Sequence, residues 1–142
     1  MSSRGSSIKK AGPVSRKPAS RKPAGRKILV IEDSPVIGPF TADILGELGF
    51  EAVGPAPNMA RARELIEQAD CDAALLDVHI RGERVFPLCE MLEAKGVPFL
   101  FTSGYADWQM PDKWEDRPRL QKPYSIEELG EALEALLGVQ AD

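Results

Sequence analysis

Apolar residues along this chain form short, unbroken runs that alternate with stretches of helical periodicity. Runs typical of strands buried on both faces lie at 27–32, 51–54, 73–77 and 98–103, and a shorter one precedes Lys122. Between them, apolar residues recur every three to four positions, which predicts helices at 35–48, 59–68, 84–95 and 126–137. This alternation predicts an α/β fold with a parallel sheet covered by helices on both faces.

Residues that favour helix ends flank several of these segments. Ser34 and Ser125 are good N-caps, and Glu128 completes a capping box at the start of the last helix. Glycines follow the first and third helices, where they are typical of a helix end. The residues of the first helix predicted to face the sheet are Ile37, Phe40, Ile44, Leu45 and Leu48.

Two segments show neither pattern. Residues 79–84, HIRGER, are predicted to be a loop. Residues 105–118 contain two prolines, two tryptophans and no helical stripe, so any fourth helix should be short, irregular or mobile. Trp108 and Trp114 could form a partner surface or cover the core, and the sequence leaves both open.

Charge divides the chain into a basic tail and an acidic body. Residues 1–27 hold nine Lys and Arg and no acid, whereas residues 28–142 hold nine Lys and Arg against 22 Asp and Glu. The tail repeats SRKPA and has few large apolar residues, so residues 1–26 are predicted to be disordered. Such a tail could bind nucleic acid or an anionic membrane, or could simply be solvated.

Length and composition limit the classes of protein to consider. With 142 residues there is room for one domain, placed at 27–138 before a short C-terminal stretch at 139–142. No apolar run is long enough to span a bilayer, and the chain does not open with a signal peptide. Cys71 and Cys89 lack metal-ligand spacing and fit reduced thiols, so we expect a cytoplasmic protein.

Charged residues lie at the ends of the predicted strands. Glu32 and Asp33 follow the first strand, Asp77 ends the third, and Lys122 follows the last. In an open parallel sheet, chemistry is found just beyond the carboxyl ends of the strands. Crowded carboxylates stay ionised only beside compensating charge, which Lys122 and a Mg²⁺ ion with oxygen ligands would supply.

Residues 27–138 resemble the receiver domain of bacterial two-component response regulators. The resemblance rests on Glu32, Asp33, Asp77 and Lys122, together with Ser103, Gly104 and Pro123. The stretch PFLFTSGY at 98–105 further resembles a stand-alone receiver subgroup with a Phe-x-Phe-x-Thr-Gly-Tyr-like signature and a weak fourth helix. The resemblance implies a flavodoxin-like (βα)5 fold with strand order 2-1-3-4-5. It also implies that Asp77 accepts phosphate from a histidine kinase or a phosphotransfer protein.

The resemblance assigns roles around Asp77. The implied Mg²⁺ ligands are the side chains of Asp33 and Asp77, the main-chain carbonyl of His79 and, through water, Glu32. The implied phosphoryl-binding groups are Lys122, the Ser103 hydroxyl and the N–H groups of Val78 and Gly104. A small residue at 104 lets the backbone approach the phosphoryl group closely. The His79 side chain is expected at the rim of the site, where it would obstruct water.

One departure concerns the switch residue of the family. Many receivers place an aromatic residue three positions before the lysine, and here that position is Arg119. Tyr105 and Tyr124 are possible substitutes, although Tyr124 is expected simply to pack beside Pro123.

We therefore expect a single-domain response regulator, a monomer or weak dimer, that signals in a phosphorelay through contacts with a downstream protein. It is not expected to be a turnover enzyme, and nucleic acid would be reached only through the basic tail. A phosphorylation-independent interaction module on the same scaffold is the alternative. A Mg²⁺-dependent phosphohydrolase ranks last, because it needs a second acid where His79 stands.

Overall fold

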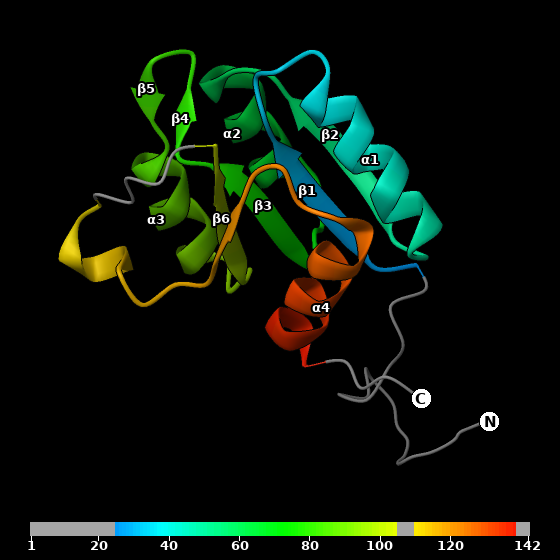
Figure 1. The fold of residues 1–142 in the computed structure, drawn as a ribbon. Helices are drawn as coiled ribbons and strands as arrows, with labels where there is room; N and C mark the ends of the chain where they lie inside the picture. Colours follow the sequence, from blue (N-terminus) through cyan, green and yellow to red (C-terminus); the bar gives the residue numbers. More distant parts are fainter. Residues whose placement is uncertain (1–24, 105–109, 139–142) are drawn as a thin grey trace.

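The fold is built around a five-stranded parallel sheet (Figure 1). The structure is a computed structural model, and it describes residues 25–104 and 110–138. The strands, in the order in which they pair, are β2 (Glu51–Ala56), β1 (Lys27–Ile31), β3 (Ala73–Asp77), β6 (Phe99–Ser103) and β7 (Arg119–Gln121). Numbered within this sheet alone, the order is 2-1-3-4-5, so the predicted flavodoxin-like topology is confirmed.

Side chains of each strand alternate between two hydrophobic cores, one on each face of the sheet. The helices α1 (Ile37–Glu47) and α4 (Ile126–Leu137) cover one face, where they pack on Ile28 and Val30. The helices α2 (Met59–Gln68) and α3 (Phe86–Ala94) cover the other face, against Leu29 and Ile31. Burial on both faces explains why the strands are unbroken apolar runs in the sequence.

Three helices begin where their capping residues indicate, or close to it. α2 follows Asn58 and α4 follows Ser125, and the side chain of each accepts a main-chain N–H from the first turn. The predicted capping box of α4 is present. α1 begins at Ile37, two residues later than predicted, although Ser34 Oγ still accepts the Ile37 N–H at 3.0 Å.

The prediction that Phe40 faces the sheet is wrong, because Phe40 is 55% exposed. α1 approaches β2 through Gly38, where a Cβ atom would lie only 2.9 Å from Pro55 Cγ. This close approach turns Gly38 and Thr41 inward, so both are buried. Phe40 therefore lies beside the buried stripe rather than within it.

Residues 79–84, predicted to be a loop, form an antiparallel hairpin of β4 (His79–Ile80) and β5 (Glu83–Arg84). The prediction failed because two-residue strands carry no apolar run. Ile80, which pairs with Glu83 next to the turn, is nevertheless fully buried.

A short or irregular helix is expected within residues 105–118, and the described part of this stretch, 110–118, contains one 3-10 turn, η1 (Asp112–Trp114). Trp114 is 2% exposed, and its ring lies against that of Phe99. Of the two roles that the sequence left open for Trp114, a partner surface or cover for the core, the structure shows the second. Tyr105 and Trp108 lie outside the described residues, as do residues 1–24 of the predicted tail at 1–26 and the predicted C-terminal stretch at 139–142. The prediction of disorder is wrong for Arg26, which is 8% exposed. No helix in the described part of the chain is long and apolar enough to cross a membrane.

Candidate functional site

Parallel strand pairing brings the predicted charged residues to one edge of the sheet. Ile31 pairs with Leu76, so Glu32 and Asp77 follow at neighbouring strand ends. On the other side, Ser103 pairs with Gln121, and the next residue is Lys122. The sheet order therefore places two acids and the lysine around the end of β3.

Lys122 makes a buried ion-pair cluster with two carboxylates. Its Nζ lies 2.8 Å from Asp77 Oδ2 and 2.9 Å from Glu32 Oε1. The side chains of these three residues are at most 12% exposed. Glu32 Oε2 also accepts the Ser34 main-chain N–H at 3.0 Å, so both oxygens of this carboxylate are oriented.

Burial and charge shift the pKa values in this cluster. Burial raises the pKa of Glu32 above its ordinary value, and the hydrogen bonds from Lys122 and Ser34 only partly oppose this shift. Burial alone would lower the pKa of Lys122, but hydrogen bonds to Asp77 and Glu32 outweigh it and leave the pKa raised. The ammonium is thus held charged, while the acids have more negative charge than one lysine balances.

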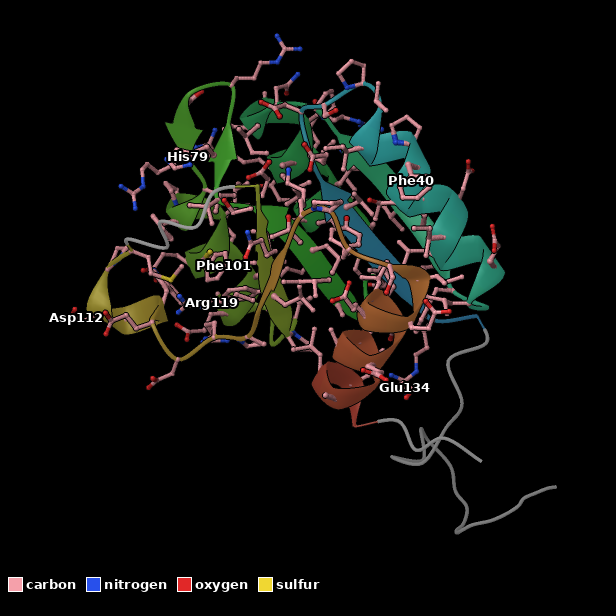
Figure 2. The ribbon with its side chains drawn as sticks, viewed as in Figure 1. Phe40, His79, Phe101, Asp112, Arg119 and Glu134 are labelled. Carbon is pink, nitrogen blue, oxygen red and sulfur yellow. The ribbon has the colours of Figure 1, made fainter. Side chains whose placement is uncertain are left out.

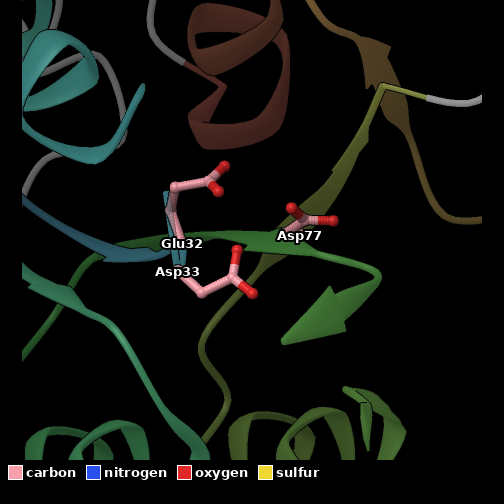
Figure 3. A group of neighbouring side chains, drawn as sticks. All are labelled: Glu32, Asp33 and Asp77. Atoms are coloured by element: carbon pink, nitrogen blue, oxygen red, sulfur yellow. The ribbon is translucent and has the colours of Figure 1, made fainter. Parts of the chain in front are cut away.

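The residues at this edge fit a divalent cation with oxygen ligands. Glu32, Asp33 and Asp77 each offer a carboxylate oxygen, and these oxygens lie within 4.8 Å of one another. Figure 3 shows Glu32 and Asp33, at the end of β1, facing Asp77 at the end of β3. A set of carboxylates without nitrogen or sulfur donors suits Mg²⁺ better than zinc or copper.

The predicted phosphoryl-binding groups differ in how they are placed. Ser103 is 3% exposed at the end of β6, next to Gly104. Gly104 lines the cleft, and a Cβ atom there would meet nothing within 4 Å, so the position faces open space rather than protein. The N–H of Val78, in contrast, donates to the Thr102 carbonyl at 3.1 Å. The sheet engages this donor here, so the predicted contact of the Val78 N–H with a phosphoryl group would have to be made in addition to the bond with Thr102.

The hairpin supplies two contacts that sequence reasoning missed. The His79 N–H lies 3.2 Å from Asp77 Oδ1, and the Arg81 N–H donates to Asp33 Oδ2 at 2.8 Å. The sequence carried no signal for these contacts, because they depend on main-chain groups of an unpredicted hairpin. The His79 side chain is exposed and lines the cleft, as expected for a residue at its rim (Figure 2).

These groups open into a cleft of about 890 Å³. Its lining combines the charged cluster with apolar and aromatic side chains, among them Phe40, Pro123 and Tyr124. Figure 2 shows Phe40 on α1, separated by the carboxyl ends of the strands from His79 on the hairpin.

Tyr124 does more than pack beside Pro123. Its hydroxyl lies 2.6 Å from Thr41 Oγ1, which is buried on α1. Burial raises the pKa of Tyr124, so the phenol stays protonated. The segment that carries Lys122 is thereby attached to α1.

Arg119 occupies the switch position predicted from the family resemblance. It is exposed, and its guanidinium donates to the Glu115 carbonyl at 2.6 Å. It therefore links β7 to the segment after η1.

Solved structures with this fold include close matches over most of the chain. SdrG from Sphingomonas melonis is 38% identical, with a TM-score of 0.72 over 80% of this chain and 97% of that one. The receiver domain of the response regulator PhyR from Erythrobacter litoralis is 22% identical, with a TM-score of 0.68 over 84% and 95% of the two chains. The receiver domain of a sensor histidine kinase from Pseudomonas aeruginosa, which holds a magnesium ion in its active-site cleft, is 22% identical with a TM-score of 0.67 over 81% and 99%.

Among curated proteins, the transcriptional regulatory protein PdtaR from Mycobacterium tuberculosis is 28% identical over 112 residues. The match covers 76% of this chain, which spans about half the length of that relative. No family model matches the sequence. The shared fold, the 38% identity to SdrG over nearly its whole length, and the acidic edge with its lysine lead to one assignment. The chain belongs to the response regulator receiver domains.

Proposed function

We propose that this receiver domain accepts a phosphoryl group on Asp77 from a phosphohistidine of a kinase or phosphotransfer protein. The observation that carries the proposal is the 2.8 Å contact between Lys122 Nζ and Asp77 Oδ2 at the bottom of an open cleft. A carboxylate that is nearly buried, paired with an ammonium and still open to a cleft is suited to act as a nucleophile.

The proposed transfer forms one bond and breaks another. A carboxylate oxygen of Asp77 attacks phosphorus while the bond from phosphorus to the partner's imidazole nitrogen breaks. The electron pair of that bond stays on the imidazole, which takes up a proton. Transfer of this kind depends on positioning and on neutralising charge on the equatorial oxygens, for which Lys122, the Ser103 hydroxyl and the Gly104 N–H are the proposed groups. Lys122 and Gly104 line the cleft, and Ser103 directly precedes Gly104 at the end of β6.

Mg²⁺ is the proposed cofactor, in line with the magnesium of the Pseudomonas aeruginosa receiver domain. Asp33 and Asp77 would hold it directly, the His79 carbonyl would supply a main-chain ligand, and Glu32 would act through water. When bound, the ion would neutralise charge on the transferred group. The three carboxylates within 4.8 Å of one another support this assignment.

Labelling with acetyl phosphate tests the proposal. The full chain incubated with acetyl phosphate and Mg²⁺ should gain the mass of one phosphoryl group, and chelation of Mg²⁺ should prevent this. Asp77→Asn should abolish labelling, whereas Asp116→Asn, at an exposed acid remote from the cleft, should not. Label at another residue, or label that survives Asp77→Asn, would rule the proposal out.

If the wild-type chain takes no label but still binds a partner, the alternative holds, and the fold serves as a phosphorylation-independent interaction module. The buried Lys122–Asp77–Glu32 cluster favours phosphorylation, because a scaffold alone has no need of such a cluster.

We further propose that residues 27–138 are the signalling unit and that it acts by changing its contacts with a downstream protein. The face formed by residues 110–118, β7 and α4 is the proposed contact surface. Beryllofluoride, which mimics the aspartyl phosphate, should alter amide hydrogen exchange in residues 110–118. Unchanged exchange there would count against this surface.

A further inference from the structure

The β4–β5 hairpin contacts both carboxylates that are proposed to bind the metal directly. Its first residue, His79, has its N–H 3.2 Å from Asp77 Oδ1, and the Arg81 N–H at its tip donates to Asp33 Oδ2 at 2.8 Å. Asp33 follows the end of β1 and has no place in the sheet. The hairpin is thus a separate element whose main chain reaches across the cleft to the β1 side.

The tip of the hairpin adopts a backbone that its sequence does not favour. Arg81 and Gly82, the two residues between β4 and β5, have φ values of 54° and 80°. A two-residue turn with positive φ at both positions normally takes Asn, Asp or Gly at the first. Arg81 is the one non-glycine residue with positive φ in the described ranges. Strain of this kind persists where surrounding contacts enforce it, often at functional sites.

Contacts hold the hairpin both at its base and beside its tip. At the base, Val85 is fully buried and its N–H donates to the Val78 carbonyl at 2.9 Å, while Ile80, next to the turn, is also fully buried. At the tip, Arg81 Nε lies 3.4 Å from the Pro57 carbonyl in the loop after β2. The position of the Arg81 N–H is therefore fixed from both ends.

We propose that this hairpin positions the metal ligands, using main-chain N–H groups to orient the carboxylates of Asp33 and Asp77. The inference rests on the proposed function, because it takes both residues to be Mg²⁺ ligands. A carboxylate has two oxygens with about four acceptor sites, so an N–H on one oxygen fixes its rotation and leaves acceptor sites for a cation. Groups that orient metal ligands in this way typically change metal affinity about 10- to 100-fold when they are lost.

A matched pair of glycine substitutions tests this role, one at Gly82, which lines the cleft, and one at Gly96, which is not among its lining residues. Gly82 and Gly96 both have positive φ, 80° and 72°, and a Cβ atom at either would meet nothing within 4 Å. Gly82→Val and Gly96→Val therefore act through the same backbone preference, one at the hairpin tip and one after α3, far from the cleft. Gly82→Ala provides a milder version if Gly82→Val folds poorly.

The first readout is Mg²⁺ affinity of the full chain, from calorimetry or amide NMR shifts. Gly82→Val should weaken Mg²⁺ binding at least about tenfold, Gly82→Ala should do so less, and Gly96→Val should leave it unchanged. Equal Mg²⁺ affinity in wild type and both Gly82 variants would overturn the inference while leaving the proposed function intact. A wild-type chain that binds no Mg²⁺ would overturn both.

The second readout needs no metal. In Mg²⁺-free buffer the Arg81 amide should exchange slowly in wild type and in Gly96→Val, and quickly in Asp33→Ala, which removes its acceptor. If the Arg81 amide exchanges equally fast in wild type and Asp33→Ala, the hydrogen bond does not hold the hairpin to Asp33, and the inference fails.

Discussion

At the scale of a single residue, Lys122 shows that burial determines how much an ion pair contributes to stability. Lys122 and Lys113 each contact two carboxylates at comparable distances. The side chain of Lys122 is 11% exposed and that of Lys113 is 50% exposed. Water screens the contacts of the exposed Lys113 much more than those of the buried Lys122. Ion pairs of similar length therefore contribute different amounts to stability.

We therefore expect Lys122→Met to lower the free energy of unfolding by roughly 3 kcal/mol in Mg²⁺-free buffer at neutral pH, because it leaves buried carboxylates without a partner. Lys113→Met, the matched control at an exposed ion pair, should have a much smaller effect. Urea denaturation measures both. Equal losses in the two variants would show that Lys122 does not offset buried charge.

The hydroxyl pair of Tyr124 and Thr41 joins the loop after Lys122 to α1. Tyr124→Phe and Thr41→Val should each destabilise the protein by about 1 kcal/mol, since each leaves one buried hydroxyl unpaired. The double variant should lose less than the sum of the two, because it removes both groups. Urea denaturation of the four proteins gives the coupling, and strictly additive losses would contradict a direct bond.

Burial also sets the chemistry of the two thiols. Cys89 is fully buried, and burial raises its pKa from 9.0 to about 12. The thiolate is the reactive form, so Cys89 in the Cys71→Ser variant should resist Ellman's reagent at pH 8 until the protein unfolds. Cys71, half-buried, should react faster in the Cys89→Ala variant. Rapid labelling of Cys89 in the folded protein would contradict its burial.

The raised pKa of Cys89 also determines how the stability of the protein changes with pH. The folded pKa of Cys89 lies above the unfolded value, so its contribution to stability is complete below about pH 9 and is lost as the pH rises toward 12. Cys89→Ala should remove this part of the alkaline loss of stability, measured by urea denaturation at a series of pH values.

At the scale of elements, η1 depends on one buried side chain. Trp114 packs against Phe99, while Lys113 and Arg117 reach the acids of α3 at the surface. The 3-10 turn is too short to be stable by itself, so the buried ring must hold this segment in place.

Trp114→Ala should cost about 3–5 kcal/mol, as expected for the loss of a buried aromatic side chain. Asp112→Ala, at an exposed position of the same turn, should stay within about 0.5 kcal/mol of wild type. Thermal unfolding followed by circular dichroism compares them. A small effect of Trp114→Ala would mean that the segment is held by its surface ion pairs instead.

Elements whose ends carry strong local signals were the ones predicted well. α4 has the predicted bounds because Ser125, Glu128 and Gly138 mark its two ends. Phe40 was misplaced because helical spacing allows more than one inward face, and only the close contact of Gly38 with Pro55 selects it. The acids and Lys122 were found because they end strands, whereas the hairpin contacts use main-chain atoms that any residue possesses.

In the whole molecule, the basic N-terminal segment meets the acidic body at the amino ends of the strands, which is the end of the sheet opposite the cleft. The chain enters β1 at its amino end, where the Gly25 N–H donates to the Gly49 carbonyl at 3.1 Å. The cleft lies at the carboxyl ends of the same parallel strands. Arg26 is 8% exposed and so belongs to the body. We therefore expect removal of the basic segment to leave the proposed phosphorylation of Asp77 unaffected.

Residues 1–24 contain seven Lys and Arg and no acid, whereas residues 28–142 have a large excess of acid. If the segment binds nucleic acid, the full chain should bind duplex DNA of any sequence in low salt, with a logarithmic salt slope no steeper than about −6 for seven phosphate contacts. Fluorescence anisotropy over a range of salt concentrations measures it. Deleting residues 1–24 should abolish binding, because the acidic body repels DNA, yet leave labelling by acetyl phosphate intact. Replacing the seven basic residues with glutamine controls for length, and binding that survives either change would show that DNA is held elsewhere or that the segment is merely solvated.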